Sequence, residues 1–256
     1  MDAPESLQRW LGAALDGGPA EAKGHAVAWL GDPPGPDTDP GEAPSISGSD
    51  GPSNFFFACR AMARPRQVHG RAVWSAPGLT EVLGASPGGH LLGPEADAVV
   101  SRDPEVACAV VTADCVPVLL AGAGGGSVAA VHAGWRGMLA GVIEAAAARL
   151  DRPVSAAIGP CITSGRFEVG PEVAEQFDAS VVVRPAGAAR PYVDLVGEAV
   201  RRLRAVGVGS IDHGGAGHLC TYDGRERFYS YRREVSHRGA ARTGRNWSIL
   251  APRRLG

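Results

Sequence analysis

The sequence predicts an α/β (α+β) fold, in which layered mixed β-sheets flanked by helices form a single compact domain. Short runs rich in β-branched residues recur between residues 96 and 159, as is typical of buried strands. Runs with apolar residues at helical spacing come between and after them. No internal repeat interrupts this pattern, and 256 residues are enough for one large core.

The N-terminal part has a different character, and we divide the chain into a divergent segment, residues 1–56, and a main domain, residues 57–256. Apolar residues at helical spacing predict a short amphipathic helix over residues 6–15. Residues 31–54 are rich in proline, glycine, aspartate and serine, which break both helix and strand. We therefore expect a long loop there.

The central part predicts a succession of strands and helices. Four short apolar runs predict buried strands, and a glycine-rich turn at residues 122–126 separates the last two: 96–101, 106–112, 116–121 and 127–132. The apolar period then becomes helical, which predicts one helix over residues 137–150. Residues 154–159 resume strand character, and Asp194 is expected to cap a second helix. Residues 228–231 predict a late strand.

Composition and charge exclude several classes of protein. The formal net charge is −2, so it favours neither nucleic acid nor an anionic membrane surface as a partner. No stretch approaches the roughly 18 apolar residues that span a bilayer, and the opening residues lack the features of a signal peptide. The five cysteines are odd in number and irregularly spaced, which favours reduced thiols. We expect a cytoplasmic protein, either a monomer or a weak homodimer.

Three segments place a metal-ligating side chain at the end of an apolar run. They are RQVHG with His69, TADC with Cys115, and VHAGWRG with His132. Strand ends are where rigid scaffolds present reactive groups. Two imidazoles and a thiolate form a plausible zinc set, because catalytic zinc keeps three protein ligands and leaves a fourth position for water. The spacing of the three residues matches no local metal motif, so the residues alone leave other interpretations open.

One of these interpretations needs no metal. Cys115 would be a nucleophile activated by His132, with Asp114 or Gln67 orienting the imidazole. Another is purely structural, with a buried cysteine beside two hydrogen-bonded histidines.

The stretch after His132 carries a separate signal. A strand ends, a glycine-containing turn follows, and a helix is predicted to begin near Gly137. Helix N-termini attract anions, Gly134 and Gly137 allow close approach of a ligand, and Arg136 can bind phosphate or carboxylate. The alternative is that both glycines only form a tight turn and that Trp135 only packs in the core.

Two other groups carry weaker signals. His213, His218 and Cys220 have the residue types of a second metal site, although glycines surround them. Arginines at the C-terminal end either hold an anion or form a solvated face; they are Arg232, Arg233 and Arg245. Three histidines without local context are expected at the surface: His25, His90 and His237.

Taken together, the motifs resemble one known family. RQVHG, ADAVVS, VTADCVPVLLA, VHAGWRGMLAGVIEAA, IGPCI with FEVGPEV, and CTY with RFYSYRR and TGR occur in one order over about residues 66–250. This series is similar to the YfiH-like laccase-domain family, catalogued as multicopper polyphenol oxidases and later described as purine nucleoside phosphorylases. The resemblance implies a compact α/β fold and zinc held by His69, Cys115 and His132.

The resemblance also implies an activity. It implies phosphorolysis of adenosine, inosine, guanosine or methylthioadenosine to the free base and ribose 1-phosphate, with adenosine deamination as a second activity. The partners would be nucleoside and phosphate, and we assign substrate or phosphate binding to five residues: Gln67, Asp114, Gly134, Arg136 and Gly137. A multicopper centre fits poorly because it needs many histidines and the chain has seven. A single copper is possible in such an N/S site.

Two departures from the family pattern keep other functions open. Leu30 stands where the family has an arginine, and the stretch between SYRR and TGR is longer than usual. One alternative is a hydrolase that edits a peptidoglycan precursor with the same His-Cys-His site. The other is a catalytically weakened relative that binds a nucleoside or a protein partner.

Overall fold

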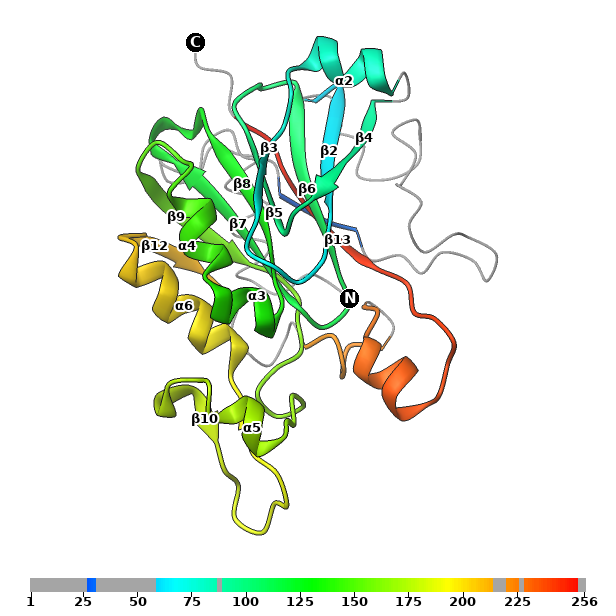
Figure 1. Ribbon diagram of the computed structural model, residues 1–256, viewed down its shortest axis with the longest axis vertical. Coiled ribbons are helices and arrows are strands. Elements are labelled where there is room, and N and C mark those ends of the chain that lie inside the picture. Colours follow the sequence, from blue (N-terminus) through cyan, green and yellow to red (C-terminus); the bar gives the residue numbers. More distant parts are fainter. Residues whose placement is uncertain (1–26, 31–58, 87–88, 214–219, 226–227, 253–256) are drawn as a thin grey trace.

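A computed structural model describes residues 27–30, 59–86, 89–213, 220–225 and 228–252 (Figure 1). The helix and the loop expected within the first 56 residues lie outside this part, as do His25 and His218, so those expectations and the domain boundary stay predictions. Within the described residues, no helix is long and apolar enough to cross a membrane.

Two mixed sheets form the centre of the fold, as the sequence predicted. One has five strands in the order β1-β13-β6-β2-β4: β1 (Val27–Leu30), β13 (Asn246–Leu250), β6 (Val106–Thr112), β2 (Ala61–Arg66) and β4 (His90–Glu95). The other has six in the order β12-β9-β7-β8-β5-β3: β12 (Ser210–Asp212), β9 (Pro153–Ile158), β7 (Val116–Gly122), β8 (Val128–Ala133), β5 (Ala98–Ser101) and β3 (Val73–Ser75). Strands β10 (Val182–Val183) and β11 (Tyr192–Val193) form a small separate pair.

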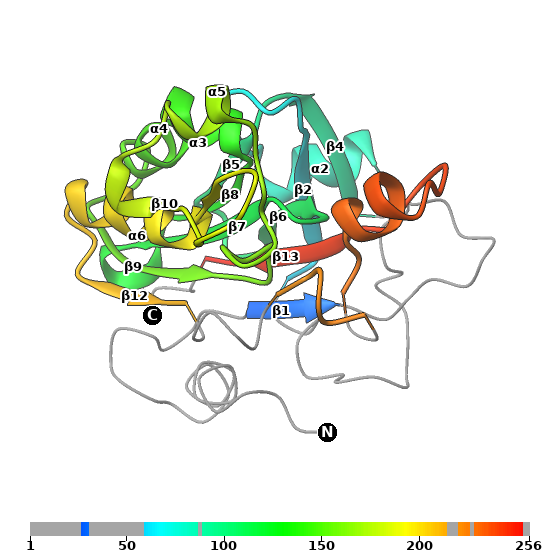
Figure 2. The same cartoon turned by 90° about the horizontal axis from the view of Figure 1, so that it is seen from below.

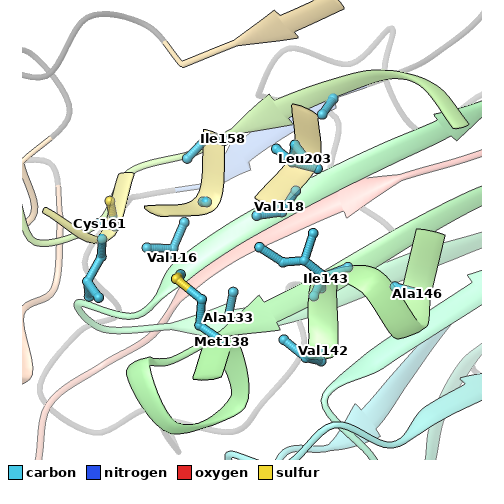
Figure 3. Close-up of a cluster of buried hydrophobic side chains, with 14 of the residues drawn as sticks. Val116, Val118, Ala133, Met138, Val142, Ile143, Ala146, Ile158, Cys161 and Leu203 are labelled. Atoms are coloured by element: carbon cyan, nitrogen blue, oxygen red, sulfur yellow. The ribbon is translucent and has the colours of Figure 1, made fainter. Parts of the chain in front are cut away.

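Helices cover the outer face of the six-stranded sheet, and the five-stranded sheet lies against its inner face (Figure 2). The covering helices are α3 (Trp135–Ala140), α4 (Val142–Ala147) and α6 (Leu195–Ala205), while α2 (Leu79–Ala85) packs beside β2 and α5 (Pro171–Ala174) lies outside this layer. There are two hydrophobic cores, one under the helices and one between the sheets, and strand β7 contributes side chains to both because its side chains alternate between faces. Val118 and Leu120 pack in the helix-covered core shown in Figure 3, and Leu119 and Ala121 pack between the sheets.

The helix expected over residues 137–150 is two helices. Gly141 adopts a left-handed conformation with φ of 88° and separates α3 from α4. Its N–H bonds to carbonyls of α3, which ends that helix in the way glycine commonly does. The apolar spacing continues across the break because the side chains on both sides still face the same sheet, so periodicity alone conceals it.

The second predicted helix is confirmed. The Asp194 side chain accepts a hydrogen bond of 3.0 Å from the Gly197 N–H at the start of α6, as expected of an N-cap. On the buried side of this helix, the Glu198 carboxylate is 1% exposed and binds Arg201 and Arg202. Arg202 also binds Glu144 at 2.7 Å, which ties α6 to α4.

The strand expected over residues 228–231 is wrong. Residues 228–230 pair with no strand, and Tyr231 precedes a π-helical turn, Arg232–His237. Side chains take the backbone groups that a strand would need: Asn246 bonds both the N–H and the carbonyl of Tyr229, and Arg233 bonds the carbonyl of Phe228. The aromatic composition of this run therefore reflects packing and not a sheet ladder.

Candidate metal centre

The three residues predicted to ligate a metal converge in space. The ligand atoms of His69, Cys115 and His132 all lie within 4.8 Å of one another. Cys115 Sγ is 3.8 Å from His69 Nε2, and the two imidazole rings meet edge to face with centroids 4.7 Å apart. His132 is buried, Cys115 is partly buried and His69 is exposed, so the cluster is open to solvent on one side. It is the one such group found among the described residues.

The pairing of two neighbouring strands brings the ligands together. His132 lies in β8 opposite Pro117 of β7, and Cys115 immediately precedes β7. Antiparallel pairing thus sets the first residues of β7 beside the last residues of β8. His69 comes from the loop after β2, where its backbone has a φ of 62°. Positive φ is uncommon for a residue other than glycine and marks a loop held in one shape.

A buried carboxylate that the sequence analysis missed holds this loop and one ligand. Asp97 is fully buried and accepts a 2.8 Å hydrogen bond from Nδ1 of His132. It also accepts from the backbone N–H groups of Val68, His69 and Gly70, at 3.3, 2.8 and 2.6 Å. The bond to Nδ1 leaves Nε2 of His132 free to face the cluster, the arrangement usual for metal-ligating histidines.

The electrostatics of this carboxylate follow from its partners. Burial opposes ionisation of Asp97, but the hydrogen bond from His132 and those from the backbone outweigh it, so its pKa is lowered. The sequence signal that marks it is one acidic residue at the head of an otherwise apolar run, ADAVVS. A buried charge needs partners, so such a residue predicts a specific contact.

The same cluster ionises the thiol. Burial alone would raise the pKa of Cys115, but the charge of His132 and hydrogen bonds from both histidines lower it to about 6. Conversely, burial would lower the pKa of His132, but Cys115 and Asp97 raise it to about 9. The cluster therefore favours the thiolate of Cys115, which is the form that binds metal.

The donor set fits one zinc ion. With Zn–S near 2.3 Å and Zn–N near 2.0–2.1 Å, tetrahedral ligands lie roughly 3.5 Å apart. The 3.8 Å between Cys115 Sγ and His69 Nε2 needs only a small adjustment to meet this. Two imidazoles and one thiolate leave a fourth position, and the exposed His69 side provides access to it. Copper also suits such N/S ligands.

The glycines after His132 allow close packing at the cluster. A Cβ on Gly134 would lie 2.9 Å from the His69 ring and 3.1 Å from Cys115 Sγ, and one on Gly137 would lie 2.7 Å from the Gly70 carbonyl oxygen. Helix α3 has only six residues, and the exposed Arg136 lies over the Trp135 ring at 4.6 Å. Both glycines are therefore needed for this segment to pack against the loop that carries His69 and Gly70 (the ligand loop), whether or not an anion binds.

The two other predicted substrate residues are engaged by the protein. Both ends of the Gln67 amide bond the backbone of Val111, at 2.7 and 2.9 Å. The buried Asp114 carboxylate accepts from Thr221 Oγ1 and from the Arg232 N–H, each at 2.6 Å. The imidazole of His132 is thus oriented by Asp97 and not, as the nucleophile interpretation expected, by Asp114 or Gln67.

The weaker sequence signals have different outcomes. Arg233 is buried and its guanidinium bonds backbone carbonyls, while Arg245 bonds the carbonyls of Thr243 and Gly244. His237 is exposed as expected, but His90 is half-buried and packs edge-on against Trp247. Of the second metal set, His213 is exposed and Cys220 is buried.

Known proteins show the same fold and related sequences. Residues 53–253 match the family model described as multi-copper polyphenol oxidoreductase laccase. "Purine nucleoside phosphorylase YfiH" of Escherichia coli K12 is 41% identical over 208 residues, 77% of each chain. "Purine nucleoside phosphorylase PA4543" of Pseudomonas aeruginosa is 43% identical over 164 residues, 60% of this chain and 64% of that protein, so the match spans less than two thirds of it.

A solved structure agrees with the sequence relatives. The crystal structure of Neisseria meningitidis protein NMB0706, of the family DUF152, superposes with a TM-score of 0.63 at 35% identity and covers 75% of each chain. The two-sheet fold, the match over residues 53–253 and the relatives at about 40% identity agree. This chain belongs to the multi-copper polyphenol oxidoreductase laccase family, the YfiH-like family that the sequence motifs resemble.

Proposed function

We propose that this protein is a zinc-dependent purine nucleoside phosphorylase with adenosine deaminase activity. The observation that carries the proposal is the convergence of His69, Cys115 and His132 within 4.8 Å. Relatives named purine nucleoside phosphorylase, 36–43% identical to this chain, support the substrate class. We propose adenosine, inosine, guanosine and methylthioadenosine as substrates.

The chain's own residues would hold and orient the metal. His69 and His132 offer Nε2, Cys115 offers the thiolate, and Asp97 fixes the ring of His132 by bonding Nδ1. When bound, zinc supplies activation of a water molecule, whose pKa it lowers to about 7. That chemistry suits deamination, in which water adds to the purine carbon that bears the amine and ammonia leaves.

Phosphorolysis requires a second reactant at the sugar. The glycosidic C–N bond breaks, a phosphate oxygen bonds to C1′, and the purine leaves with a proton as the free base. We propose Arg136 as the residue that binds phosphate, because it is exposed at the second position of α3, four residues after His132, and its guanidinium is always charged. Gly134 and Gly137 contribute by letting α3 begin against the ligand loop.

The test combines an activity assay with elemental analysis. Purified protein with adenosine and phosphate is expected to yield adenine, ribose 1-phosphate and inosine, and to contain about one zinc per chain. Cys115→Ser should lower both zinc content and turnover, whereas Cys59→Ser, a half-buried thiol outside the cluster, should change neither. A Cys115→Ser protein that loses turnover and keeps its full metal content would instead favour a nucleophilic cysteine.

A second substitution tests the packing of the cluster. Gly134→Ala places a methyl group against His69 and Cys115 and should weaken zinc binding and turnover together. Gly165→Ala is the matched control, because nothing lies within 4 Å of the added Cβ. If wild-type protein binds adenosine tightly with zinc present but forms no product, the phosphorylase assignment fails and a nucleoside-binding relative is the better account.

A further inference from the structure

Asp114, the residue before the candidate ligand Cys115, has a backbone conformation that few residues adopt. Its φ is 87°, which a residue with a Cβ keeps only where its surroundings impose it, although aspartate tolerates positive φ better than most residues. Residues 113–115 form the bend between β6 of the five-stranded sheet and β7 of the six-stranded sheet. Because Cys115 follows directly, the direction of its side chain depends on the conformation of Asp114.

Three hydrogen bonds from distant parts of the described chain hold Asp114 in this bend. The Thr221 hydroxyl and the Arg232 N–H donate to its two carboxylate oxygens, each at 2.6 Å, from positions 107 and 118 residues away in sequence. The Ile162 N–H donates to its backbone carbonyl at 3.0 Å. Hydrogen bonds to a carboxylate are shorter and stronger than those between neutral groups. The buried side chain therefore fixes the bend from outside the two sheets.

One of these donors belongs to the wall of a pocket. Arg232 begins the π-helical turn Arg232–His237, and both of these residues line a pocket of about 380 Å³ together with Trp135 of α3. The Arg232 side chain is held as well, since its Nη1 donates to the Glu168 carbonyl at 2.9 Å. Turns of π-helix are rare and occur frequently at functional sites. The Asp114 carboxylate thus bonds this turn, while the Asp114 backbone continues into Cys115.

We propose that Asp114 is a positioning residue that couples the metal-ligating thiolate of Cys115 to the π-helical turn Arg232–His237. When Cys115 holds a metal ion, the backbone of the bend is fixed, and the carboxylate then holds the Arg232 N–H more firmly. Conversely, an ordered turn favours the bend that presents the thiolate, because coupling between two sites is reciprocal. The proposal rests on the proposed function for metal binding alone and does not depend on the reaction catalysed.

The exchange rate of the Arg232 amide proton measures this coupling, because that N–H is the donor to Asp114. Hydrogen exchange is followed by NMR on the full chain, with and without one equivalent of zinc, and elemental analysis of the same samples gives the bound zinc. In wild-type protein we expect zinc to slow exchange of this amide roughly fivefold or more, as is typical of coupled sites. Amides of α6, which packs against α4, should exchange equally in both samples.

Two substitutions of Asp114 separate its carboxylate from its backbone conformation. Asp114→Gly tolerates the positive φ but removes both side-chain bonds, so zinc should no longer slow the Arg232 amide. Zinc affinity should fall by about 10- to 100-fold, as for the loss of an outer partner of a ligand. Asp114→Asn is the conservative control and should retain most of the zinc effect. Its amide oxygen can accept from the Arg232 N–H, and its amide nitrogen can donate to the Thr221 hydroxyl.

A purely structural role for Asp114 gives a different result. Asp114→Gly would then speed exchange of the Arg232 amide by the same factor with and without zinc, and zinc affinity would not change. That result, or wild-type protein that binds zinc without slowing this amide, overturns the coupling and leaves the proposed function intact. Wild-type protein that takes up no zinc overturns both.

A milder substitution decides the question if Asp114→Gly does not fold. Thr221→Val removes only the hydroxyl that donates to Asp114 and leaves the bond from the Arg232 N–H. We expect zinc to slow the Arg232 amide less in this variant than in wild-type protein. A zinc effect as large as that of wild-type protein would overturn the proposal.

Discussion

Asp97 and Glu198 are both buried carboxylates, yet their partners differ. Glu198 is 1% exposed and bonds two guanidinium groups, Arg201 Nε at 2.8 Å and Arg202 Nε at 2.6 Å. Asp97 is fully buried and bonds one imidazole and three backbone N–H groups of the loop that carries His69. Glu198 bonds permanent charges of its own helix, and one of them, Arg202, also binds Glu144 on α4, while Asp97 connects two candidate metal ligands.

The difference shows how a buried charge is assigned a role. A carboxylate satisfied by arginines of its own helix, one of which also binds Glu144 of a neighbouring helix, stabilises the contact between the two helices. A carboxylate that bonds the non-ligating nitrogen of one histidine, and the loop that carries a second histidine, sets the positions of the donor atoms. We therefore expect changes at Asp97 to affect metal binding more than stability, and changes at Glu198 to do the reverse.

The largest effect is expected at His132, which is both a candidate metal ligand and the imidazole partner of Asp97. His132→Ala removes one donor atom and the imidazole partner of Asp97. Zinc content should fall to background, and turnover should fall by more than about a hundredfold, since losing only an outer partner of a ligand costs about 10- to 100-fold. Elemental analysis and the adenosine assay measure the two effects. Retention of stoichiometric zinc by this variant would show that His132 is not a ligand.

A smaller effect is expected when only the outer partner changes. Asp97→Asn keeps the size of the side chain but removes the charge that fixes His132 Nδ1 and the three loop N–H groups. Zinc affinity should fall by about 10- to 100-fold, as measured by competition with a chromophoric chelator. Unchanged affinity, with a large loss of thermal stability, would place Asp97 in the same class as Glu198.

The converse substitution tests the structural carboxylate. Glu198→Gln leaves the side chains of Arg201 and Arg202 without their charged partner on α6. The free energy of unfolding should fall by roughly 1–3 kcal/mol, as for losing charged hydrogen bonds at a buried site. Urea denaturation measures it. Zinc affinity should stay within about twofold of wild type, and a larger change would break the distinction between the two carboxylates.

The smallest expected effect is in the pH dependence of that stability. Burial opposes ionisation of Glu198, but Arg201 and Arg202 outweigh it, so its folded-state pKa lies below the unfolded value of 4.5. The stability it contributes is complete above pH 4.5 and is lost as the pH falls through the folded pKa. The difference between wild-type protein and Glu198→Gln should therefore shrink as the pH falls below 4.5. A difference that is constant from pH 7 to 3 would contradict this.

The sequence predicted the central strands and the ligands at their ends for one physical reason. Buried strands are short β-branched runs, and β5 to β9 lie within about two residues of the expected bounds. Where a strand is well predicted, so is the position of Cys115 before it or of His132 near its end. Whether these strand ends meet depends on strand order, which no local pattern encodes. The expectation that the three ligands share one site came from the family resemblance.

Other features depended on contacts between distant residues. Asp97 lies within the motif ADAVVS, but its partners lie 27 to 35 residues away in sequence. The run over residues 228–231 has strand composition, yet Asn246 and Arg233 satisfy its backbone. Gly141 divides a helix whose apolar period is unbroken. In each case, a side chain or a backbone dihedral overrides the pattern of apolar residues.

The most direct test of the account is X-ray absorption at the zinc edge on protein purified without chelator. We predict one zinc per chain, coordinated by one sulfur and two imidazole nitrogens with a light atom in the fourth position, and loss of the sulfur contribution in Cys115→Ser. Zinc-loaded protein whose spectrum contains no sulfur ligand, or an unchanged spectrum in that variant, would contradict the assignment of His69, Cys115 and His132.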